Sequence, residues 1–233
     1  TYNFAVVIDD MLMKISHIIR GEDHISNTPK QILIYEALGA EVPKFGHLGM
    51  ILAPDRSKLS KRHGATAVSD FVKQGYLTDA LINFVALLGW APSDGHEIKP
   101  VAEIAEDFRI NEISSSNSIF EYDKLNWMNG QYIKKMDISK LTDMVIPFLS
   151  KYSDMENGLN NMSHSNLEKM VEITREPITT LNEMEYDCAY FFGKDVDYTE
   201  GVETLKKPEA KTVLNRVMEL IDGWDFTSDE IIH

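Results

Sequence analysis

The sequence HIIRGEDHISNTPKQILIYEALG occupies residues 17–39 and joins a strand pattern to a helix pattern. Residues 17–20 form a short run with Ile18 and Ile19 at its centre, which is predicted to be a short strand. Thr28 is predicted as the N-cap of the following helix and Pro29 as its first residue, and the helix is expected to stop at Gly39. A strand that leads into a helix favours an α/β sheet, in which ligands contact the polar residues at strand exits.

Apolar segments on both sides extend this pattern. Residues 3–8 are rich in Val, Ile and Phe and are predicted to form another buried strand, because the run is too short for a helix. Residues 45–52 supply a further strand-like run. The order strand, strand, helix, strand over residues 3–52 predicts an α/β fold for the start of the chain.

The remainder is predicted to be helical, with the main domain break near Met136 and Asp137. Start and stop signals place helices at residues 69–75, 79–88, 101–108, 122–135, 138–152, 165–175, 178–192 and 208–221. No strand pattern of comparable quality follows residue 70. The sequence therefore predicts an α/β part followed by helical domains.

The charge balance limits the contacts with nucleic acid. The 37 acidic and 23 basic residues give a formal net charge of −14, which argues against a general coating of nucleic acid. An acidic protein can still bind RNA through a local basic surface. Positive charge clusters between Lys44 and His63.

Composition also bears on compartment and chemistry. The single cysteine, Cys188, excludes an internal disulfide and a cysteine-rich zinc site. No apolar run approaches the roughly 20 residues that span a bilayer, and no secretory leader pattern is present. We therefore predict no membrane association and expect the cytoplasm or the reducing interior of an organelle.

Residues 58–62, Lys-Leu-Ser-Lys-Arg, form the basic loop, which is bracketed by Pro54 and Gly64. Lysine ammonium groups suit a phosphate tail that gains charge as it leaves. This makes Lys58 and Lys61 candidate phosphate ligands. The alternative is that the loop is simply solvated.

Arg20 stands at the predicted exit of the strand, where a guanidinium can bind a carboxylate through two hydrogen bonds. A salt bridge to Glu22 or Asp23 is the alternative. Asp23 is a candidate acceptor for a ribose hydroxyl, or a cap for the next helix. Tyr2 either lines a small polar pocket or only packs.

No grouping of residues supports nucleophilic catalysis, since Cys188 lies within a predicted apolar helix. The histidines lack the spacing of a zinc pair, so no protein-bound metal is predicted. His24 and His47 flank apolar residues, where a histidine more often serves the structure than a ligand.

Four motifs follow one another along the chain. They are Tyr2-Asn3-Phe4-Ala5; Arg20-Gly21-Glu22-Asp23-His24 with Ser26-Asn27-Thr28-Pro29; Lys58-Leu59-Ser60-Lys61-Arg62; and Lys124-Leu125-x-Trp127-Met128-Asn129-Gly130-x-Tyr132-Ile133. In this order they resemble the glutamyl-tRNA synthetases of bacterial or organellar type, which are class I aminoacyl-tRNA synthetases. The third motif resembles the KMSKS signature, with Leu59 and Arg62 as departures shared within the glutamyl and glutaminyl subgroup.

The resemblance implies an α/β remnant of a Rossmann-type catalytic domain followed by predominantly α-helical stem-contact and anticodon-binding domains. Residues 1–64 would be the C-terminal part of the catalytic domain with its KMSKS-type loop. Residues 65–136 would be the helical stem-contact domain, and residues 137–233 the first part of the helical anticodon-binding domain. The helical character after residue 138 favours glutamyl over glutaminyl identity, because glutaminyl enzymes of eukaryotic type carry β-barrels there.

The resemblance also implies roles for individual residues. Lys61 would contact the ATP phosphates and stabilise the departing pyrophosphate while Lys58 assists, and these two lysines are the catalytic candidates. Arg20 would hold the glutamate side-chain carboxylate, with Tyr2 beside it. The implied ATP-binding residues are Asp23, His24, Lys58, Ser60, Lys61 and Arg62.

The implied reaction uses ATP with Mg²⁺ to convert L-glutamate into glutamyl-adenylate and then transfers the glutamate to tRNA(Glu). We expect a monomer. Catalysis of this type is mostly positioning and neutralisation of phosphate charge, so it needs no protein nucleophile.

The chain is expected to be a piece of a longer protein. It begins with Thr1 rather than Met and has no HIGH-type sequence, the other ATP signature of the family. We therefore expect that this piece alone does not form glutamyl-adenylate. The alternatives are a non-catalytic tRNA-binding or interaction module of synthetase origin and a generic α/β nucleotidyltransferase.

Overall fold

The computed structural model describes residues 2–60, 62, 64, 67–151, 153–192 and 206–221. These residues belong to two compact units, Thr1–Lys135 and Met136–His233, which we describe separately as the first and the second unit. The division falls at the break expected near Met136. A further boundary inside the first unit, at residue 64, stays a prediction.

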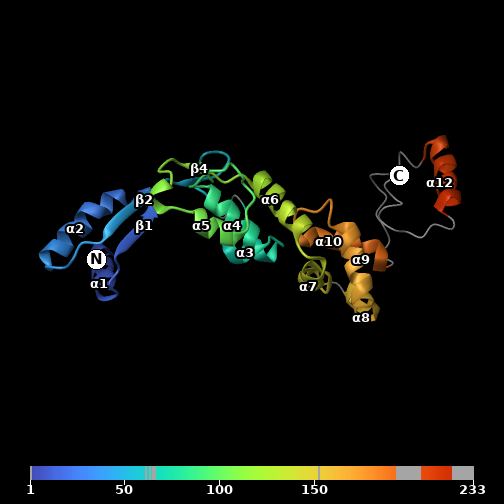
Figure 1. Cartoon of the computed structure of the whole chain (residues 1–233), viewed down its shortest axis with the longest axis horizontal. Coiled ribbons are helices and arrows are strands. Elements are labelled where there is room, and N and C mark those ends of the chain that lie inside the picture. The colour runs from blue at the N-terminus through green and yellow to red at the C-terminus, as the bar shows by residue number, and fades with distance from the viewer. Residues whose placement is uncertain are drawn as a thin grey trace. The chain divides into compact units, whose positions relative to one another are not determined.

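The first unit contains a two-stranded parallel sheet, whose strands follow the N-terminal helix (Figure 1). The strand β1 (His17–Gly21) pairs with β2 (Lys44–Leu48), and Arg20 lies opposite His47 in the register. Between the strands come the 3-10 helix η1 (Glu22–Asn27) and the helix α2 (Thr28–Ala37). The predicted strand and helix of residues 17–39 are thus confirmed.

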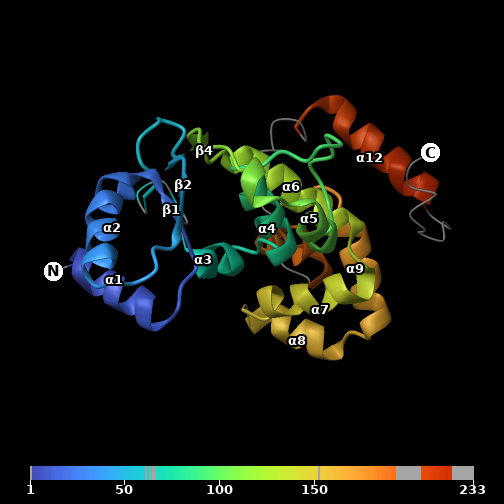
Figure 2. The ribbon, with the colours of Figure 1, turned by 60° about the vertical axis from the view of Figure 1, so that its left-hand side comes forward.

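The predicted strand at residues 3–8 is wrong, because these residues lie in the helix α1 (Tyr2–Leu12). This helix packs against α2 beside the sheet (Figure 2). Val7 is its one fully buried residue, while Tyr2 and Phe4 are each about half exposed. A strand inside a parallel sheet has both faces covered, whereas a helix needs only one covered stripe. Packing against α2 therefore overrides the β propensity of Val and Ile.

The strand predicted over residues 45–52 is interrupted after Leu48. Residues Ile51–Leu52 (β3) instead pair in parallel with Ser118–Ile119 (β4), a short strand that was not predicted. Gly49 permits this change of partner, because a Cβ at that position would overlap the backbone oxygen of Ser116. The close approach fixes residues 116–118 against the end of β2.

Four helices make up the rest of the first unit: α3 (Val68–Lys73), α4 (Thr78–Leu87), α5 (Val101–Asp107) and α6 (Tyr122–Lys135). All four were predicted to within one or two residues. The core forms where α4 packs on α6, and its buried side chains are Phe71, Tyr76, Leu81, Phe84, Phe120, Leu125 and Met128. Phe84 and Phe120 meet edge to face with ring centroids 4.9 Å apart, a favoured aromatic geometry.

A buried lysine ties the segment between α4 and α5 to the core. Lys99 is 5% exposed, and its Nζ lies 2.7 Å from Asp94 and 2.5 Å from Asp107. These carboxylates, Asp107 first, raise the pKa of Lys99 and keep it charged. Its backbone N–H donates to Asn83, and its carbonyl accepts from the Tyr132 hydroxyl. Burial raises the pKa of Tyr132 to about 12, so that hydroxyl remains a donor.

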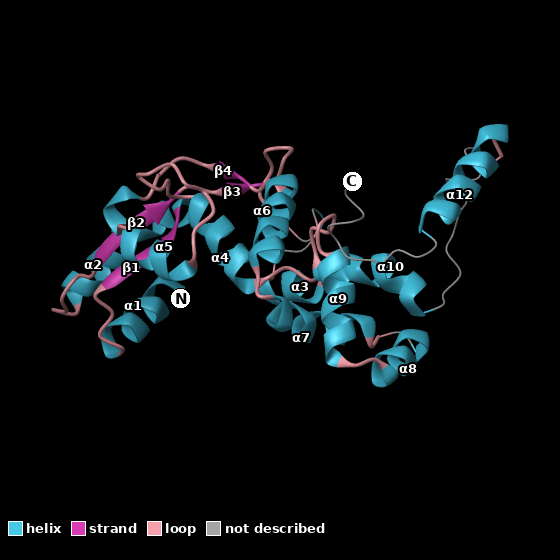
Figure 3. Cartoon of the chain, turned by 45° about the vertical axis from the view of Figure 1, so that its right-hand side comes forward, coloured by secondary structure: helices cyan, strands magenta, loops and turns pink. Residues whose placement is uncertain are grey.

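The second unit consists of helices, and Figure 3 shows strands only in the first unit among the described residues. Its elements are α7 (Ile138–Leu149), α8 (Ser153–Asn161), α9 (His164–Thr174), η4 (Leu181–Glu183), α10 (Met184–Cys188), η5 (Ala189–Phe192) and α12 (Pro208–Ile221). The helices α7, α9 and α10 contact one another and bury Leu141, Val145, Met170 and Met184.

Two predictions for the second unit fail. The helix α8 was not predicted, because its sequence SDMENGLNN is mostly polar, with only Met155 and Leu159 as buried apolar residues. Residues 178–192 were predicted as one helix but are broken into η4, α10 and η5. The Glu183 carboxylate accepts bonds from the Thr179 N–H and from the hydroxyls of Thr179 and Thr180. These bonds hold the backbone in a turn ahead of α10.

The described architecture is therefore a small α/β part followed by helices, as the sequence predicts. Of the helices that the structure describes, none is at once long enough and apolar enough to cross a bilayer.

Asn129 provides a test of the α4–α6 packing. It is fully buried on α6, and its Oδ1 accepts the Leu77 backbone N–H at 2.8 Å. We expect Asn129→Ala to lower the free energy of unfolding by about 1–3 kcal/mol, because this buried N–H loses its acceptor. Urea unfolding followed by tryptophan fluorescence measures the change.

The matched control is Lys135→Ala, an exposed position on the same helix. This change should alter the free energy of unfolding by less than about 0.5 kcal/mol. Equal losses in the two variants would contradict the role given to the buried hydrogen bond.

Candidate active site

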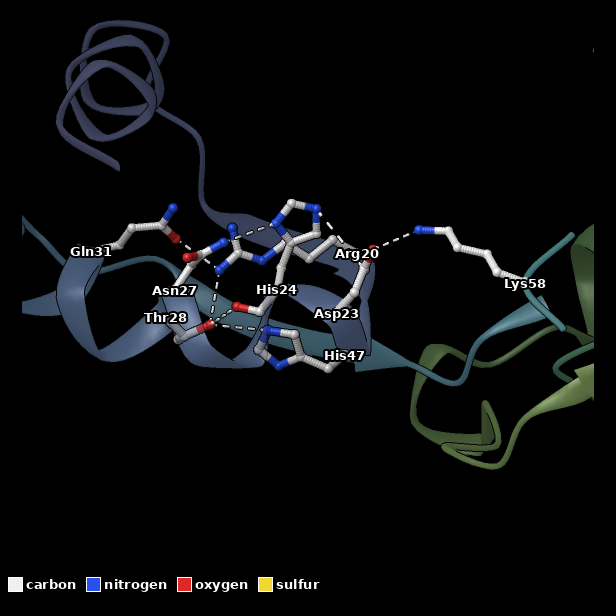
Figure 4. A network of polar contacts seen from close by, with 8 residues as sticks. All are labelled: Arg20, Asp23, His24, Asn27, Thr28, Gln31, His47 and Lys58. Carbon is white, nitrogen blue, oxygen red and sulfur yellow. Dashed lines mark hydrogen bonds and ion pairs between the residues drawn. The ribbon is translucent and has the colours of Figure 1, made fainter. Parts of the chain in front are cut away.

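Arg20 lies near the carboxyl end of β1, and its guanidinium is held on the side of the sheet that carries α2 (Figure 4). Its Nη2 donates to Thr28 Oγ1 at 2.8 Å and to Gln31 Oε1 at 2.7 Å. The guanidinium carbon lies 5.3 Å from the centroid of the Phe45 ring, within the range of a cation–π contact. The alternative salt bridge to the following acidic residues is not formed.

Thr28 serves this site rather than the helix end, contrary to the prediction that it is an N-cap. The helix α2 starts at Thr28 itself, and Asn27 occupies the N-cap position without a side-chain cap bond. The Thr28 hydroxyl accepts from Arg20, donates to the His24 carbonyl at 3.3 Å and lies 3.0 Å from His47 Nε2. One hydroxyl thus links the strand exit, η1 and β2.

His47 on β2 is half-buried and lies opposite Arg20 in the strand register. Its ring stacks on the Phe45 ring. Burial, followed by the charges of Arg20 and His24, lowers the pKa of His47. The imidazole is therefore neutral near pH 7 and adds no second positive charge beside the guanidinium.

An ion pair connects the strand exit to the basic loop. Lys58 Nζ donates to Asp23 Oδ2 at 3.1 Å, and this hydrogen bond is the main reason that the pKa of Asp23 is lowered. Both side chains are well exposed, so the pair contributes little stability and opens readily. Gly21 allows the arrangement, because a Cβ there would lie 2.7 Å from Asp23 Oδ1. Asp23 lies inside η1 and does not cap α2.

A tight turn at residues 53–57 precedes the basic loop and brings the start of the loop back beside β3. The Ala53 N–H donates to the Ser57 carbonyl at 2.8 Å, and the Leu59 N–H donates to the Ile51 carbonyl at 3.3 Å. The Asp55 carboxylate accepts from the N–H and the hydroxyl of Ser57. This turn directs Lys58 toward Asp23 (Figure 4).

The remaining candidates of the loop are placed only in part. Arg62 is exposed and its Nη2 donates to Ser57 Oγ at 3.2 Å, while Ser60 is half-buried. Lys61 lies outside the described residues. Its role stays a prediction, as do the roles of the other site residues.

Tyr2 lies beside His24, with ring centroids 6.3 Å apart. The His24 Nδ1 atom lies 3.3 Å from the side-chain nitrogen of Asn27, within hydrogen-bond distance. Its Nε2 atom lies 4.0 Å from Asp23 Oδ1. Contacts therefore link five of the predicted residues at the end of β1: Tyr2, Arg20, Asp23, His24 and Lys58.

One residue of this network, Gln31, was missed in the sequence, and its partner Asn3 was quoted only as part of the first motif. Gln31 is fully buried on α2 and bonds Arg20, and its Nε2 donates to Asn3 Oδ1 at 3.1 Å. The available signal was an amide two residues after Pro29, within a helix whose buried stripe also includes Tyr35. A polar residue on a buried helix face needs partners, and these are visible only in three dimensions.

The described residues outside this network include a buried thiol and line a large cavity. Burial raises the pKa of the Cys188 thiol to about 11, which keeps it protonated and unreactive. In the part of the chain that the structure describes, no three His, Cys, Asp or Glu side chains are grouped to hold a metal ion. A cavity of about 520 Å³ beside α4 is mostly apolar and contains none of the predicted site residues.

Comparison with known proteins identifies two families. Residues 1–127 match the catalytic domain of the class I tRNA synthetases for glutamate and glutamine, and residues 140–233 match an anticodon-binding domain. The glutamate–tRNA ligase of Carboxydothermus hydrogenoformans is 44% identical over 220 residues, which cover 94% of this chain and 46% of that protein.

Further relatives agree with these matches. The glutamate–tRNA ligase 2 of Caldanaerobacter subterraneus subsp. tengcongensis is 44% identical over 99% of this chain and 48% of its own length. A crystal structure of a glutamate tRNA ligase from Elizabethkingia meningosepticum superposes with a TM-score of 0.77 at 30% identity, covering 98% of this chain and 48% of that one. The chain thus spans about half the length of the relatives it matches.

The lowered pKa of His47 predicts a pH dependence of stability. As the pH falls below about 6.5, the unfolded chain binds a proton at His47 before the folded protein does. Folding stability is therefore lost from about pH 6.5 downward to the lowered pKa, and this loss is absent at higher pH. Urea unfolding at pH 7.5 and pH 5.5 measures it.

His47→Gln is the control, because an amide can still bond Thr28 but does not titrate. This variant should lose less stability between the two pH values than the parent protein. Equal losses would mean that other groups cause the pH dependence.

Proposed function

The chain belongs to the class I tRNA synthetases that serve glutamate and glutamine, and from that premise we propose that the full-length gene product is a glutamate–tRNA ligase. It joins L-glutamate to tRNA(Glu) in two steps, with ATP as the energy source. Because the chain spans about half of the relatives it matches, the proposal concerns the full-length product.

The arrangement of Arg20 is the observation that carries this proposal. Its guanidinium lies near the carboxyl end of a parallel strand, the edge at which open α/β sheets bind ligands. Among the described residues, only its Nη2 makes hydrogen bonds, which leaves the two N–H groups of Nη1 for a substrate. A guanidinium suits a carboxylate in charge and geometry. In this proposal it binds the side-chain carboxylate of glutamate, with Tyr2 beside it.

The basic loop supplies the other half of the site. Lys58, Ser60, Lys61 and Arg62 would bind the ATP phosphates, while Asp23 and His24 would face the ribose and adenine. Lys58 is held by the exposed carboxylate of Asp23 until a triphosphate competes for it. Contacts saved for the transition state increase the rate more than contacts made equally in the ground state.

The first step requires positioning rather than a protein nucleophile. The α-carboxylate of glutamate attacks the α-phosphorus of ATP, a new carboxyl–phosphate bond forms, and pyrophosphate leaves with the electron pair of the broken bond. Lys61 and Lys58 would stabilise the negative charge on the departing group. In the second step a terminal hydroxyl of tRNA(Glu) would attack the carboxyl carbon of glutamyl-adenylate. An ester bond to the tRNA forms, the hydroxyl gives up its proton, and AMP leaves with the electron pair of the broken carboxyl–phosphate bond.

Mg²⁺ would accompany ATP and supply further neutralisation of phosphate charge. The carboxylates beside the basic loop are already engaged, Asp23 by Lys58 and Asp55 by Ser57. Among the described residues, these two carboxylates are therefore not available as magnesium ligands, and no other group of three acidic, histidine or cysteine side chains is placed to bind the ion. We derive no step through Mg²⁺.

The helical parts would bind the tRNA. We propose that residues 65–136 contact the stem and that residues 137–233 begin the anticodon-binding domain. On α6, Trp127 is 49% exposed while Met128 and Asn129 are buried, so the exposed indole is a candidate contact with RNA. For an enzyme of protein synthesis we propose the cytoplasm or an organelle interior, and a monomeric state.

Charging of tRNA(Glu) by the full-length gene product tests the proposal. We expect ATP-dependent attachment of labelled glutamate to tRNA(Glu). Binding of tRNA without charging would instead favour a non-catalytic tRNA-binding module. ATP turnover with no preference for tRNA(Glu) would favour a generic nucleotidyltransferase.

Arg20→Ala tests the amino-acid site. We expect the KM for glutamate in aminoacylation to rise at least about thirtyfold, because a desolvated charge pair with the substrate is lost. Arg109→Ala is the matched control, since Arg109 is exposed and donates only to nearby backbone carbonyls. An unchanged KM in Arg20→Ala would exclude Arg20 as the glutamate ligand.

Lys61→Ala tests the phosphate site. We expect the rate of glutamate-dependent ATP–pyrophosphate exchange to fall by a factor of about 100 to 1,000, as on the loss of a donor that stabilises transition-state charge. The KM for glutamate should change little. Lys73→Ala, an exposed position at the end of α3, should behave like the parent protein, and a full exchange rate in Lys61→Ala would refute the role of the loop.

A further inference from the structure

We propose that Gln31, supported by Asn3, is a positioning residue that holds the Arg20 guanidinium ready for the glutamate side chain without neutralising its charge. This inference rests on the role proposed above for Arg20. It assigns a function to a buried amide that the four sequence motifs leave out.

The burial of Gln31 shows that its amide is part of a built site. Gln31 is completely buried on α2. A buried amide lowers stability unless its polar atoms find partners. Here Oε1 accepts from Arg20 Nη2 at 2.7 Å (Figure 4). Nε2 donates to Asn3 Oδ1 at 3.1 Å, so both ends of the amide are bonded.

Arg20 fixes which way round the Gln31 amide lies, because a guanidinium only donates hydrogen bonds, and Asn3 then accepts from the other end of the amide. If the Gln31 amide turned over, its NH₂ group would face the N–H of Arg20, and its oxygen would leave the Asn3 oxygen without a donor. The chain of hydrogen bonds from α1 through α2 to β1 therefore has one direction. That direction presents an acceptor to the guanidinium.

This acceptor prevents rotation of the guanidinium. Gln31 and Thr28 together use both N–H groups of Nη2, while Nε is buried and has no hydrogen-bond partner in the described structure. Nη1 is then the part of the guanidinium left to meet a carboxylate. A group already held in its binding orientation loses less entropy when the substrate arrives.

The charge of the surroundings matters as much as the geometry. Thr28 and Gln31 are neutral acceptors, and the lowered pKa of His47 keeps that ring neutral near pH 7. The guanidinium is thus oriented by neutral groups and keeps its full positive charge. A glutamate at position 31 would form an ion pair with Arg20 and compete with the substrate carboxylate.

Steady-state kinetics of ATP–pyrophosphate exchange by the full-length gene product test this inference. We expect Gln31→Ala to raise the KM for glutamate by about tenfold to a hundredfold, the worth of a hydrogen bond to a charged group. The KM for ATP and kcat should stay within about threefold. Leu33→Ala, an exposed position on α2, is the matched control and should show no change.

Two further variants separate positioning from a merely structural role. Gln31→Glu keeps the shape and the acceptor but cancels the charge, so we expect a larger rise in the KM for glutamate than in Gln31→Ala. Asn3→Ala should cause a smaller rise in the same direction. The double variant Asn3→Ala with Gln31→Ala should be no worse than Gln31→Ala alone, because Asn3 acts through Gln31.

Several outcomes would overturn the proposal. One is a parental KM for glutamate in Gln31→Glu, and another is a Gln31→Ala variant that loses kcat and both KM values together with its thermal stability. If Gln31→Ala does not fold, the Asn3→Ala and Gln31→Glu kinetics decide. A parental KM in Arg20→Ala would remove the glutamate role of Arg20 itself, whereas an effect there with none in Gln31→Ala would overturn only the positioning role.

Discussion

A guanidinium that binds a substrate carboxylate has to be held in place without being neutralised by the protein. At Arg20, to which we assign this role as a proposal, the structure places two neutral acceptors, an aromatic face and a neutral histidine. Each of these groups comes from α2 or β2, so the parallel register of β1 and β2 and the packing of α1 on α2 both bear on the site. The small α/β part positions one cation, and the proposed chemistry depends on it.

The contacts around this cation differ in how firmly they hold. The bonds of Arg20 to Thr28 and Gln31 lie in a partly buried network, where an unpaired group is costly to leave. The Lys58–Asp23 pair is exposed and contributes little to stability, so the Lys58 ammonium group is only lightly held. In the proposed site, the amino-acid side would thus be prearranged, and the Lys58 side chain would be able to move when a nucleotide binds.

The sequence predicts the regular parts of this fold well. Apolar periodicity predicts the bounds of α4, α5 and α6 to within one residue. The four motifs identify Arg20, Asp23 and Lys58 as site candidates. Sequence reasoning fails where tertiary contacts decide the outcome. Residues 3–8 have β propensity but pack as a helix on α2, and the Thr28 hydroxyl is taken by Arg20 instead of capping α2. Gln31 gave no local sign of its partners, because Asn3 and Arg20 approach it from other elements.

The single cysteine allows local opening of the second unit to be measured by chemical labelling. Cys188 is fully buried on α10, its pKa is raised to about 11, and the chain contains no second thiol. Alkylating reagents will modify it only when α10 opens away from α7 and α9. The rate of labelling therefore reports on breathing of this unit alone, without engineering and without interference from the sheet that holds Arg20.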